Sequence, residues 1–126
     1  MIRFENVSKN YSNGVEALKN INMEIGDGEF VFIVGDSGSG KSTLIKLLLK
    51  ELEPTEGTIE VDGITLGKMK RRFVPMYRRK IGCVFQEFRL LKDRNVYENV
   101  AFAQRVVATP SKKIRKDVPR ILSTVG

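Results

Sequence analysis

The sequence has little that would place it outside an ordinary folded domain. Its single cysteine, Cys83, cannot support a disulfide or a cysteine-based metal framework, and we expect it to be a small buried residue in a strand. No apolar run approaches the roughly 20 residues of a membrane span, and the first five residues lack signal-peptide features. We therefore expect a cytoplasmic protein, which leaves docking onto a membrane protein open.

Composition indicates a soluble globular protein of single-domain length. The chain has 126 residues, of which 41% are hydrophobic and 29% are charged. Lysine and arginine number 22 against 15 acidic residues, so the formal net charge is +7 and the pI is near 9.7. This excess favours an anionic partner such as phosphate, nucleic acid or lipid headgroups.

The positive charge is concentrated between residues 68 and 80, where no acidic residue occurs. The cations there are Lys68, Lys70, Arg71, Arg72, Arg78, Arg79 and Lys80. The segment is either a solvated connection or a contact with an anionic membrane surface, to which each basic residue contributes about 1 kcal/mol. Nucleic-acid binding is less favoured, because no aromatic residues are arranged for base stacking.

The stretch from Gly35 to Ser42 fits the pattern G-x-x-x-x-G-K-[ST]. An apolar segment, Glu29–Val34, precedes it and predicts a strand, whereas Thr43–Lys50 contains strong helix formers. In this context glycines let successive backbone N–H groups cradle phosphate oxygens at a helix N-terminus. Lys41 then reaches the β- and γ-phosphates, and the Ser42 hydroxyl can bind Mg²⁺. The alternative is a glycine-serine turn that binds nothing.

The rest of the pattern predicts antiparallel strands first and helices later. Alternation on either side of Asp62-Gly63 predicts a hairpin over 58–66. Asn95 and Glu98 predict a helix start, with one apolar face made of Val96, Val100, Ala103 and Val107. A first strand is expected to begin with Ile2, Phe4 and Val7, and a second to include residues 18–25, with turn residues at Ser12-Asn13-Gly14 between them. The other expected elements are a buried helix over 43–50, a short helix near 74–79, a strand over 81–85, and a last helix that begins at Thr109-Pro110 and that Pro119 interrupts, by kinking it or by opening a new helix.

Three further features carry a family resemblance. An aromatic residue, Tyr11, precedes an Asn-Gly turn; Gln86 ends the predicted strand 81–85; and the helix start at Asn95–Val100 follows closely. With the glycine loop, these resemble the nucleotide-binding domain of ATP-binding-cassette (ABC) proteins, and residues 81–103 look closest to its bacterial cell-division branch. The resemblance implies an α/β fold of the P-loop type. Residues 1–87 would contain the leading antiparallel β subdomain and the P-loop core, and residues 88–126 the start of a helical subdomain.

The resemblance also implies roles for single residues. Tyr11 looks like the aromatic that stacks on adenine, although it could instead pack at a strand end. Gln86 looks like the glutamine that senses Mg²⁺ and the γ-phosphate, and its alternative is a solvent-facing amide. Lys41 and Gln86 are thus the implied catalytic residues, and Ser42 and Gln86 the implied ligands of Mg²⁺. The residues implied to bind ATP are Tyr11, Gly35, Ser37, Gly38, Ser39, Gly40, Lys41, Ser42 and Thr43.

One residue of the loop departs from the family pattern. Asp36 stands where close relatives usually have proline, so a carboxylate lies near the bound phosphates. We expect its side chain to point outward and to affect affinity modestly.

The expected partners are a second copy of the full-length protein and an integral membrane protein at the cytoplasmic face of the inner membrane. Phe88, Leu90 and Leu91 would contact the membrane partner, or equally would pack between subdomains. No nucleic-acid partner is expected. The alternatives are the ATPase subunit of a conventional transporter, of amino-acid or lipoprotein type, and a nucleotide-binding module without hydrolysis.

Parts of a working cassette are not found. The chain contains no Leu-Ser-Gly-Gly-type signature loop, no Asp-Glu pair ending an apolar strand, and no switch histidine. We therefore expect the N-terminal portion of a longer cassette, with weak binding of MgATP and negligible turnover. The strand neighbours of Val31–Val34 would also be missing, which predicts association or low solubility.

Overall fold

A computed structural model describes residues 1–126. It contains two compact units, Met1–Ile81 and Gly82–Gly126, which are described in turn. The units divide a few residues before the boundary that we expected from the sequence. No helix has the length and apolar character that crossing a membrane requires.

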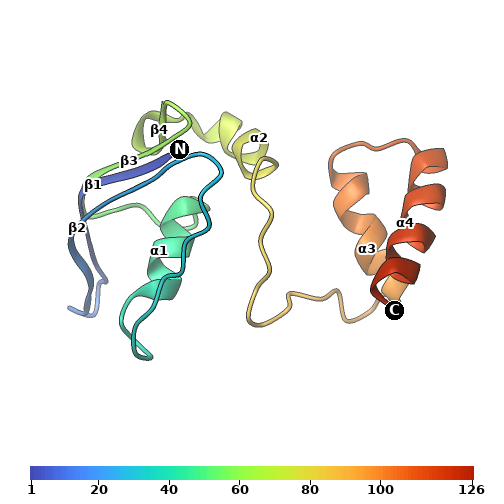
Figure 1. Ribbon diagram of the computed structural model, residues 1–126, viewed down its shortest axis with the longest axis horizontal. Coiled ribbons are helices and arrows are strands. Elements are labelled where there is room, and N and C mark those ends of the chain that lie inside the picture. Colours follow the sequence, from blue (N-terminus) through green and yellow to red (C-terminus); the bar gives the residue numbers. More distant parts are fainter. The chain divides into compact units, whose positions relative to one another are not determined.

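The first unit is built on a four-stranded antiparallel sheet in the order β2-β1-β3-β4 (Figure 1). Phe4 of the central strand β1 pairs with Met23 on one side and with Ile59 on the other. The predicted antiparallel β structure is confirmed. The strands are β1 (Ile2–Asn10), β2 (Glu16–Ile25), β3 (Glu56–Val61) and β4 (Ile64–Thr65).

A bulge interrupts β1 and changes which side chains face the core. Asn6 has a φ of +51°, and the pairing with both neighbouring strands shifts register after it. As a result Phe4 and Val7 are both buried, three residues apart rather than two. Gly57 of β3 lies against this bulge with a φ of +85°, and a Cβ there would collide with the Asn6 carbonyl oxygen.

The β3–β4 hairpin has the turn that its sequence predicts. Asp62 and Gly63 have φ values of +48° and +79°, and Val61 pairs with Ile64 directly across them. Two successive residues with positive φ are the requirement of a type I′ turn, which Asp-Gly satisfies.

Helix α1 (Lys41–Leu48) packs on the sheet, and the core of the unit lies between them (Figure 1). Within α1 only Thr43, Leu44 and Leu47 are buried, while Ile45 is 40% exposed. Over the predicted range 43–50, Leu49 is buried as well and only Ile45 and Lys46 are exposed, so the expected burial holds for most of these residues. The buried residues that form the core of the unit are Phe4, Val7, Leu18, Leu44, Leu47, Ile59, Leu66 and Tyr77.

Two short 3₁₀ turns and a short helix follow the hairpin. They are η1 (Leu66–Lys68), η2 (Arg71–Phe73) and α2 (Val74–Arg78), which confirms the short helix predicted near 74–79. The Tyr77 hydroxyl donates to the Leu48 carbonyl at 2.5 Å, and Arg78 Nε donates to the Leu49 carbonyl at 2.8 Å. Helix α2 thus provides donors for carbonyls at the C-terminal end of α1 that the helix itself leaves unpaired.

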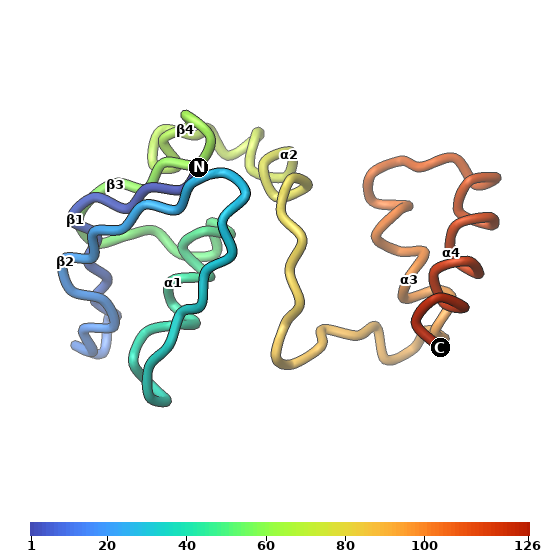
Figure 2. Tube along the Cα trace, viewed as in Figure 1, coloured from blue at the N-terminus to red at the C-terminus, as the bar shows by residue number.

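Two predicted strands do not form. The segment Glu29–Val34 has no ladder partner, and Figure 2 shows it as part of the extended connection between β2 and α1. Residues 81–85 also belong to no sheet, and Cys83, which we expected to be buried, is exposed. The prediction of strands at these two places was wrong, because a stretch with strand propensity becomes a strand only beside a hydrogen-bonding partner.

The second unit is a pair of helices, α3 (Val96–Val106) and α4 (Ser111–Val125), with Ala101, Ile114 and Val118 as its buried core. The predicted cap is confirmed, because the Asn95 side chain accepts the Glu98 backbone N–H at 2.8 Å. Of the predicted apolar face, Val100 packs against this core, but Val96, Ala103 and Val107 are exposed, and the buried residue of α3 is Ala101.

The start of α4 and its proline also differ from prediction. Pro110 occupies the N-cap with a ψ of 140°, so the helix begins one residue later than Thr109-Pro110 suggested, and no side chain caps it. Helix α4 continues through Pro119 to Val125. The proline therefore neither ends the helix nor opens a new one.

Candidate functional site

The predicted phosphate loop forms a tight turn between the extended segment Glu29–Val34 and α1. Ser39 N–H donates to the Asp36 carbonyl at 3.0 Å, and Gly38 and Gly40 have φ values of +81° and +101°. A Cβ on Gly35 would lie 2.5 Å from Ser39 Oγ. Gly38 and Gly40 thus allow a left-handed backbone, and Gly35 lets the Ser39 side chain lie close to the main chain, as the sequence pattern requires.

Gly40 is the residue that joins the loop to the helix. It is the N-cap of α1, and no side chain caps the helix start. A Cβ at Gly40 would collide with the Ala17 carbonyl oxygen of β2 and lie 2.9 Å from Leu18 Cδ2. Since the first N–H groups of a helix have no intrahelical acceptor, this start offers donors and the positive end of the helix dipole to an anion.

The Lys41 ammonium group is held by the loop itself. Lys41 Nζ donates to the Gly35 carbonyl, to the Asp36 carbonyl at 2.8 Å and to Ser39 Oγ at 3.2 Å. The cation therefore lies beside the backbone that the motif assigns to phosphate. An arriving phosphate can replace these neutral acceptors with charged oxygens, which form stronger hydrogen bonds.

Ser42 and Thr43, the next two residues, lie in different environments. Ser42 is exposed, and its hydroxyl has no hydrogen-bond partner in the protein. Thr43 is only 6% exposed, and its Oγ1 lies 2.9 Å from the Tyr11 hydroxyl. The structure contains no cluster of three or more His, Cys, Asp or Glu residues able to hold a metal. Binding of Mg²⁺ through Ser42 and Gln86 stays a prediction.

Tyr11 lies beside the start of α1, and its stacking on adenine stays a prediction. It begins the turn after β1, where its N–H donates to the Val15 carbonyl at 2.8 Å. Its ring is half-buried, with Lys9 Nζ 5.8 Å from the ring centroid. The hydroxyl contact with Thr43 joins two residues that are 32 positions apart. Sequence reasoning predicted the ring's role but gave no signal for this hydrogen bond.

Gln86 belongs to the second unit, so its contact with Mg²⁺ and the γ-phosphate stays a prediction. The residue is exposed and begins a turn in which the Phe88 N–H donates to the Phe85 carbonyl at 3.2 Å. Phe88 and Arg89 both have positive φ, at +59° and +51°. Backbone strain of this kind is concentrated at functional segments.

The segment after Gln86 exposes two of the three predicted anchors. Phe88 is 76% and Leu90 is 64% exposed, whereas Leu91 is half-buried. Asn99 of α3 fixes the end of this segment, because its side chain accepts the Leu91 N–H at 2.7 Å and donates to the Leu91 carbonyl at 3.2 Å. Sequence reasoning missed Asn99.

Comparison with known proteins decides the family. The family model described as "ABC transporter" matches residues 18–126. The chain belongs to the ABC transporter family. The match includes the loop, α1 and Gln86, and it begins after Tyr11. The predicted fold class is confirmed as well, since the solved structures below are ABC cassettes of mixed α/β architecture.

Similar proteins come from two branches of the family. The cell division ATP-binding protein FtsE of Mycobacterium tuberculosis is 47% identical over 127 residues, which cover 100% of this chain and 55% of that protein. The methionine import ATP-binding protein MetN of Helicobacter hepaticus is 44% identical over 126 residues, covering 100% of this chain and 36% of that protein. The chain thus spans about half the length, or less, of these relatives.

A solved structure shows the same fold with nucleotide products bound. The ATP-binding cassette MJ0796, in a dimeric post-hydrolysis state with ADP and Pi, superposes with a TM-score of 0.86 at 36% identity. The match covers 98% of this chain and 56% of that one. A second dimeric structure of MJ0796 gives a TM-score of 0.83 at 38% identity.

Proposed function

We propose that the chain is the nucleotide-binding portion of the ATP-binding subunit of a cell-division ABC complex of the FtsE type. The observation that carries this proposal is the glycine loop at the uncapped start of α1, with the Lys41 ammonium held at its backbone. The FtsE relatives, 40–47% identical over essentially the whole chain, support the division branch.

The loop and Tyr11 would bind MgATP in this function. The backbone amides from Gly38 to Thr43 would surround the phosphates, Lys41 would neutralise the β- and γ-phosphates, and Ser42 would ligate Mg²⁺. The Tyr11 ring would stack on adenine, a contact that contributes about 1–3 kcal/mol by analogy with base–aromatic stacking. Positioning and charge neutralisation are what phosphoryl transfer chiefly needs.

Hydrolysis requires more than this chain contains. The Asp-Glu pair, the signature loop and the switch histidine of the family are absent from the sequence, and Gln86 alone cannot position water and Mg²⁺. We propose that the full-length protein dimerises around ATP at the cytoplasmic face of the inner membrane. Its membrane partner would be FtsX-like and would contact the segment after Gln86, coupling the ATP cycle to remodelling of the septal cell wall.

A titration of the 126-residue chain with MgATP tests the loop. We expect weak binding that Lys41→Ala reduces by about tenfold to a hundredfold, the effect of losing charge-assisted hydrogen bonds. Lys46→Ala is the matched control, because Lys46 lies on the exposed side of the same helix. Equal affinity of both variants would contradict the loop assignment, and steady-state ATPase activity of this chain would contradict its catalytic incompleteness.

A second candidate is the ATPase subunit of a conventional importer, which the MetN relative favours. The membrane protein that co-purifies with the full-length protein separates the two candidates: an FtsX-like protein supports the division role and a solute permease contradicts it. A third candidate, a nucleotide-binding module without hydrolysis, would be supported by ATP binding without turnover in the full-length protein.

A further inference from the structure

The cationic stretch between residues 68 and 80 folds into one continuous exposed surface. It comprises η1, η2 and α2, and all seven of its lysine and arginine side chains are exposed. We define the α2 surface as Lys68, Lys70, Arg71, Arg72, Phe73, Met76 and Lys80. Phosphate binding at the glycine loop makes no use of it.

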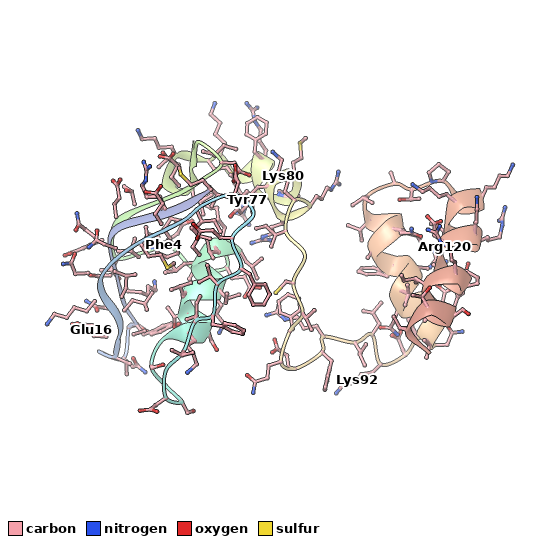
Figure 3. All side chains as sticks on the ribbon, viewed as in Figure 1. Phe4, Glu16, Tyr77, Lys80, Lys92 and Arg120 are labelled. Atoms are coloured by element: carbon pink, nitrogen blue, oxygen red, sulfur yellow. The ribbon has the colours of Figure 1, made fainter.

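The α2 surface rests on a rigid support. Tyr77 is 5% exposed and hydrogen-bonds to the Leu48 carbonyl, while Arg78 donates to the carbonyls of Leu49 at 2.8 Å and Lys50 at 3.1 Å. These two residues fix one side of α2 to the end of α1, and the other side is turned outward. Figure 3 labels Tyr77 and Lys80 in this part of the unit.

Two large apolar side chains project from the outward side. Phe73 is 46% exposed and Met76 is 60% exposed, and their spacing of three residues puts them on neighbouring positions of one helical face. Arg72 lies with its guanidinium carbon 4.9 Å from the centroid of the Phe73 ring. Apolar tips surrounded by cations are typical of a surface that meets the headgroup region of a membrane.

Most of the charge on this surface is unpaired within the chain, although the charge of Lys80 interacts with that of Asp62. Lys68, Lys70, Arg71, Arg72 and Lys80 form no salt bridge, in contrast to Arg3, Arg105 and Arg120, each of which pairs with a carboxylate. A pocket of about 500 Å³ adjoins the surface between Arg71 and Arg78. Arg78 and Lys50 in that pocket are already bonded to carbonyls, which favours a broad electrostatic contact over a single anion site.

We propose that the α2 surface docks on an anionic lipid membrane, with Phe73 and Met76 entering the headgroup layer. Nucleic acid fits less well, because Phe73 is the single aromatic on the surface and Arg72 lies over its ring, so no stacking platform exists. The inference goes beyond the proposed function, since it needs neither nucleotide nor a membrane-protein partner.

Vesicle flotation of the 126-residue chain, without nucleotide, tests the proposal. The probes are vesicles containing about one-third phosphatidylglycerol in phosphatidylcholine, and phosphatidylcholine alone; flotation separates bound protein from aggregates, which sediment. We expect binding to the anionic vesicles that is lost at high salt because the charges are screened. Since each basic residue near the surface contributes about fivefold, removing four should weaken binding by roughly 600-fold.

The test variant is Lys68→Gln, Lys70→Gln, Arg71→Gln and Arg72→Gln together. Its matched control replaces four exposed cations of α4 with glutamine and has the same net charge: Lys112, Lys113, Arg115 and Lys116. We expect the control to float with at least a third of the wild-type affinity. A third variant, Phe73→Ser with Met76→Ser, should lose about tenfold while keeping all the charge.

Each of several outcomes would overturn the proposal. If the α4 control lost as much vesicle binding as the test variant, the binding would depend on net charge alone. If the wild type floated equally well with phosphatidylcholine vesicles, charge would have no role in the binding. Tighter binding of an RNA duplex through the same four cations would assign the surface to nucleic acid instead. Circular dichroism shows whether the variants fold, and Tyr77 and Arg78 are kept in all of them for this reason.

Discussion

Two stretches of the first unit, β1 and the segment Glu29–Val34, differ in that only β1 is paired in the structure, although both were predicted to be strands. Phe4 in β1 is 1% exposed between two paired strands, whereas Phe32 in the segment Glu29–Val34 is 80% exposed and pairs with nothing. Residues 29–34 are the richer in aromatic and β-branched residues, with five of six, whereas β1 contains three of nine. The comparison shows that strand propensity here reports how well a side chain fits a covered, pleated surface, and that the covering has to come from elsewhere in the molecule.

The chain spans about half the length of its relatives. The family resemblance leads us to expect that the strand entering the phosphate loop lies inside a parallel sheet. We propose that the partners of Glu29–Val34 and of residues 81–85 belong to the part of the relatives that this chain does not match. Exposed backbone donors and acceptors beside Phe30, Phe32 and Val34 also favour pairing between copies, so association of this chain stays a prediction.

The strongest test of the comparison replaces one phenylalanine in each stretch. Phe4→Ala removes a fully buried ring and should lower the free energy of unfolding by about 3–5 kcal/mol. Phe32→Ala should change it by less than about 0.5 kcal/mol. Urea unfolding followed by circular dichroism measures both. A cost at Phe32 close to that at Phe4 would show that the extended segment packs in solution, and the contrast between the two stretches would disappear.

A second test asks how tightly the paired sheet is built at its bulge. Gly57→Ala adds a Cβ that collides with the Asn6 carbonyl oxygen, at a φ of +85°, so we expect a loss of about 2–4 kcal/mol. Gly63→Ala is the matched control, because its φ is +79° but nothing lies within 4 Å, and the strain alone should cost about 1 kcal/mol. Equal losses in thermal unfolding would mean that the backbone at the bulge moves freely.

Local signals made some of this structure predictable. Asp62-Gly63 encodes its own turn, and Asn95 caps its own helix, because in each case the side chain or backbone acts within four residues. The glycine loop belongs to the same class, since its conformation is dictated by Gly38 and Gly40. The candidate site depends chiefly on this glycine loop.

Features that need a distant partner could not be predicted. The hydrogen bonds from Tyr77 and Arg78 to the end of α1, and from Tyr11 to Thr43, join residues about 30 positions apart and leave no periodic pattern. The prediction of the packed face of α3 failed in part for a related reason. Apolar residues occur on all sides of that helix, so only packing against α4 selects Ala101.

The smallest effect that we predict concerns pH and the edge of the paired sheet. The Met1 amino group lies 2.6 Å from Asp27 Oδ1 and 2.7 Å from Asp62 Oδ1, and hydrogen bonds to these carboxylates, first Asp27 and then Asp62, raise the pKa of the amine from 8.0 to about 10. A raised folded-state pKa stabilises the fold fully below pH 8 and ceases to do so as the pH rises through 10. The same contact lowers the pKa of Asp62, so its contribution is also lost in acid, below the ordinary range of a carboxyl.

The contact therefore stabilises the sheet in a window from mildly acidic to mildly alkaline pH. Solvent screens these exposed charges, so the change should be small but measurable as a decline in melting temperature between pH 8 and 10. Asp27→Asn combined with Asp62→Asn should flatten that decline, and asparagine suits the φ of +48° at residue 62. If the melting temperature of the double variant declined with pH as steeply as that of the wild type, the Met1 amine would not be linking the β3–β4 hairpin to the turn after β2. The segment Glu29–Val34 takes no part in this contact. After correction for the intrinsic exchange rate, hydrogen exchange of its amides should therefore show no change in protection between pH 8 and 10. This result would again separate the unpaired segment from the paired strand β1.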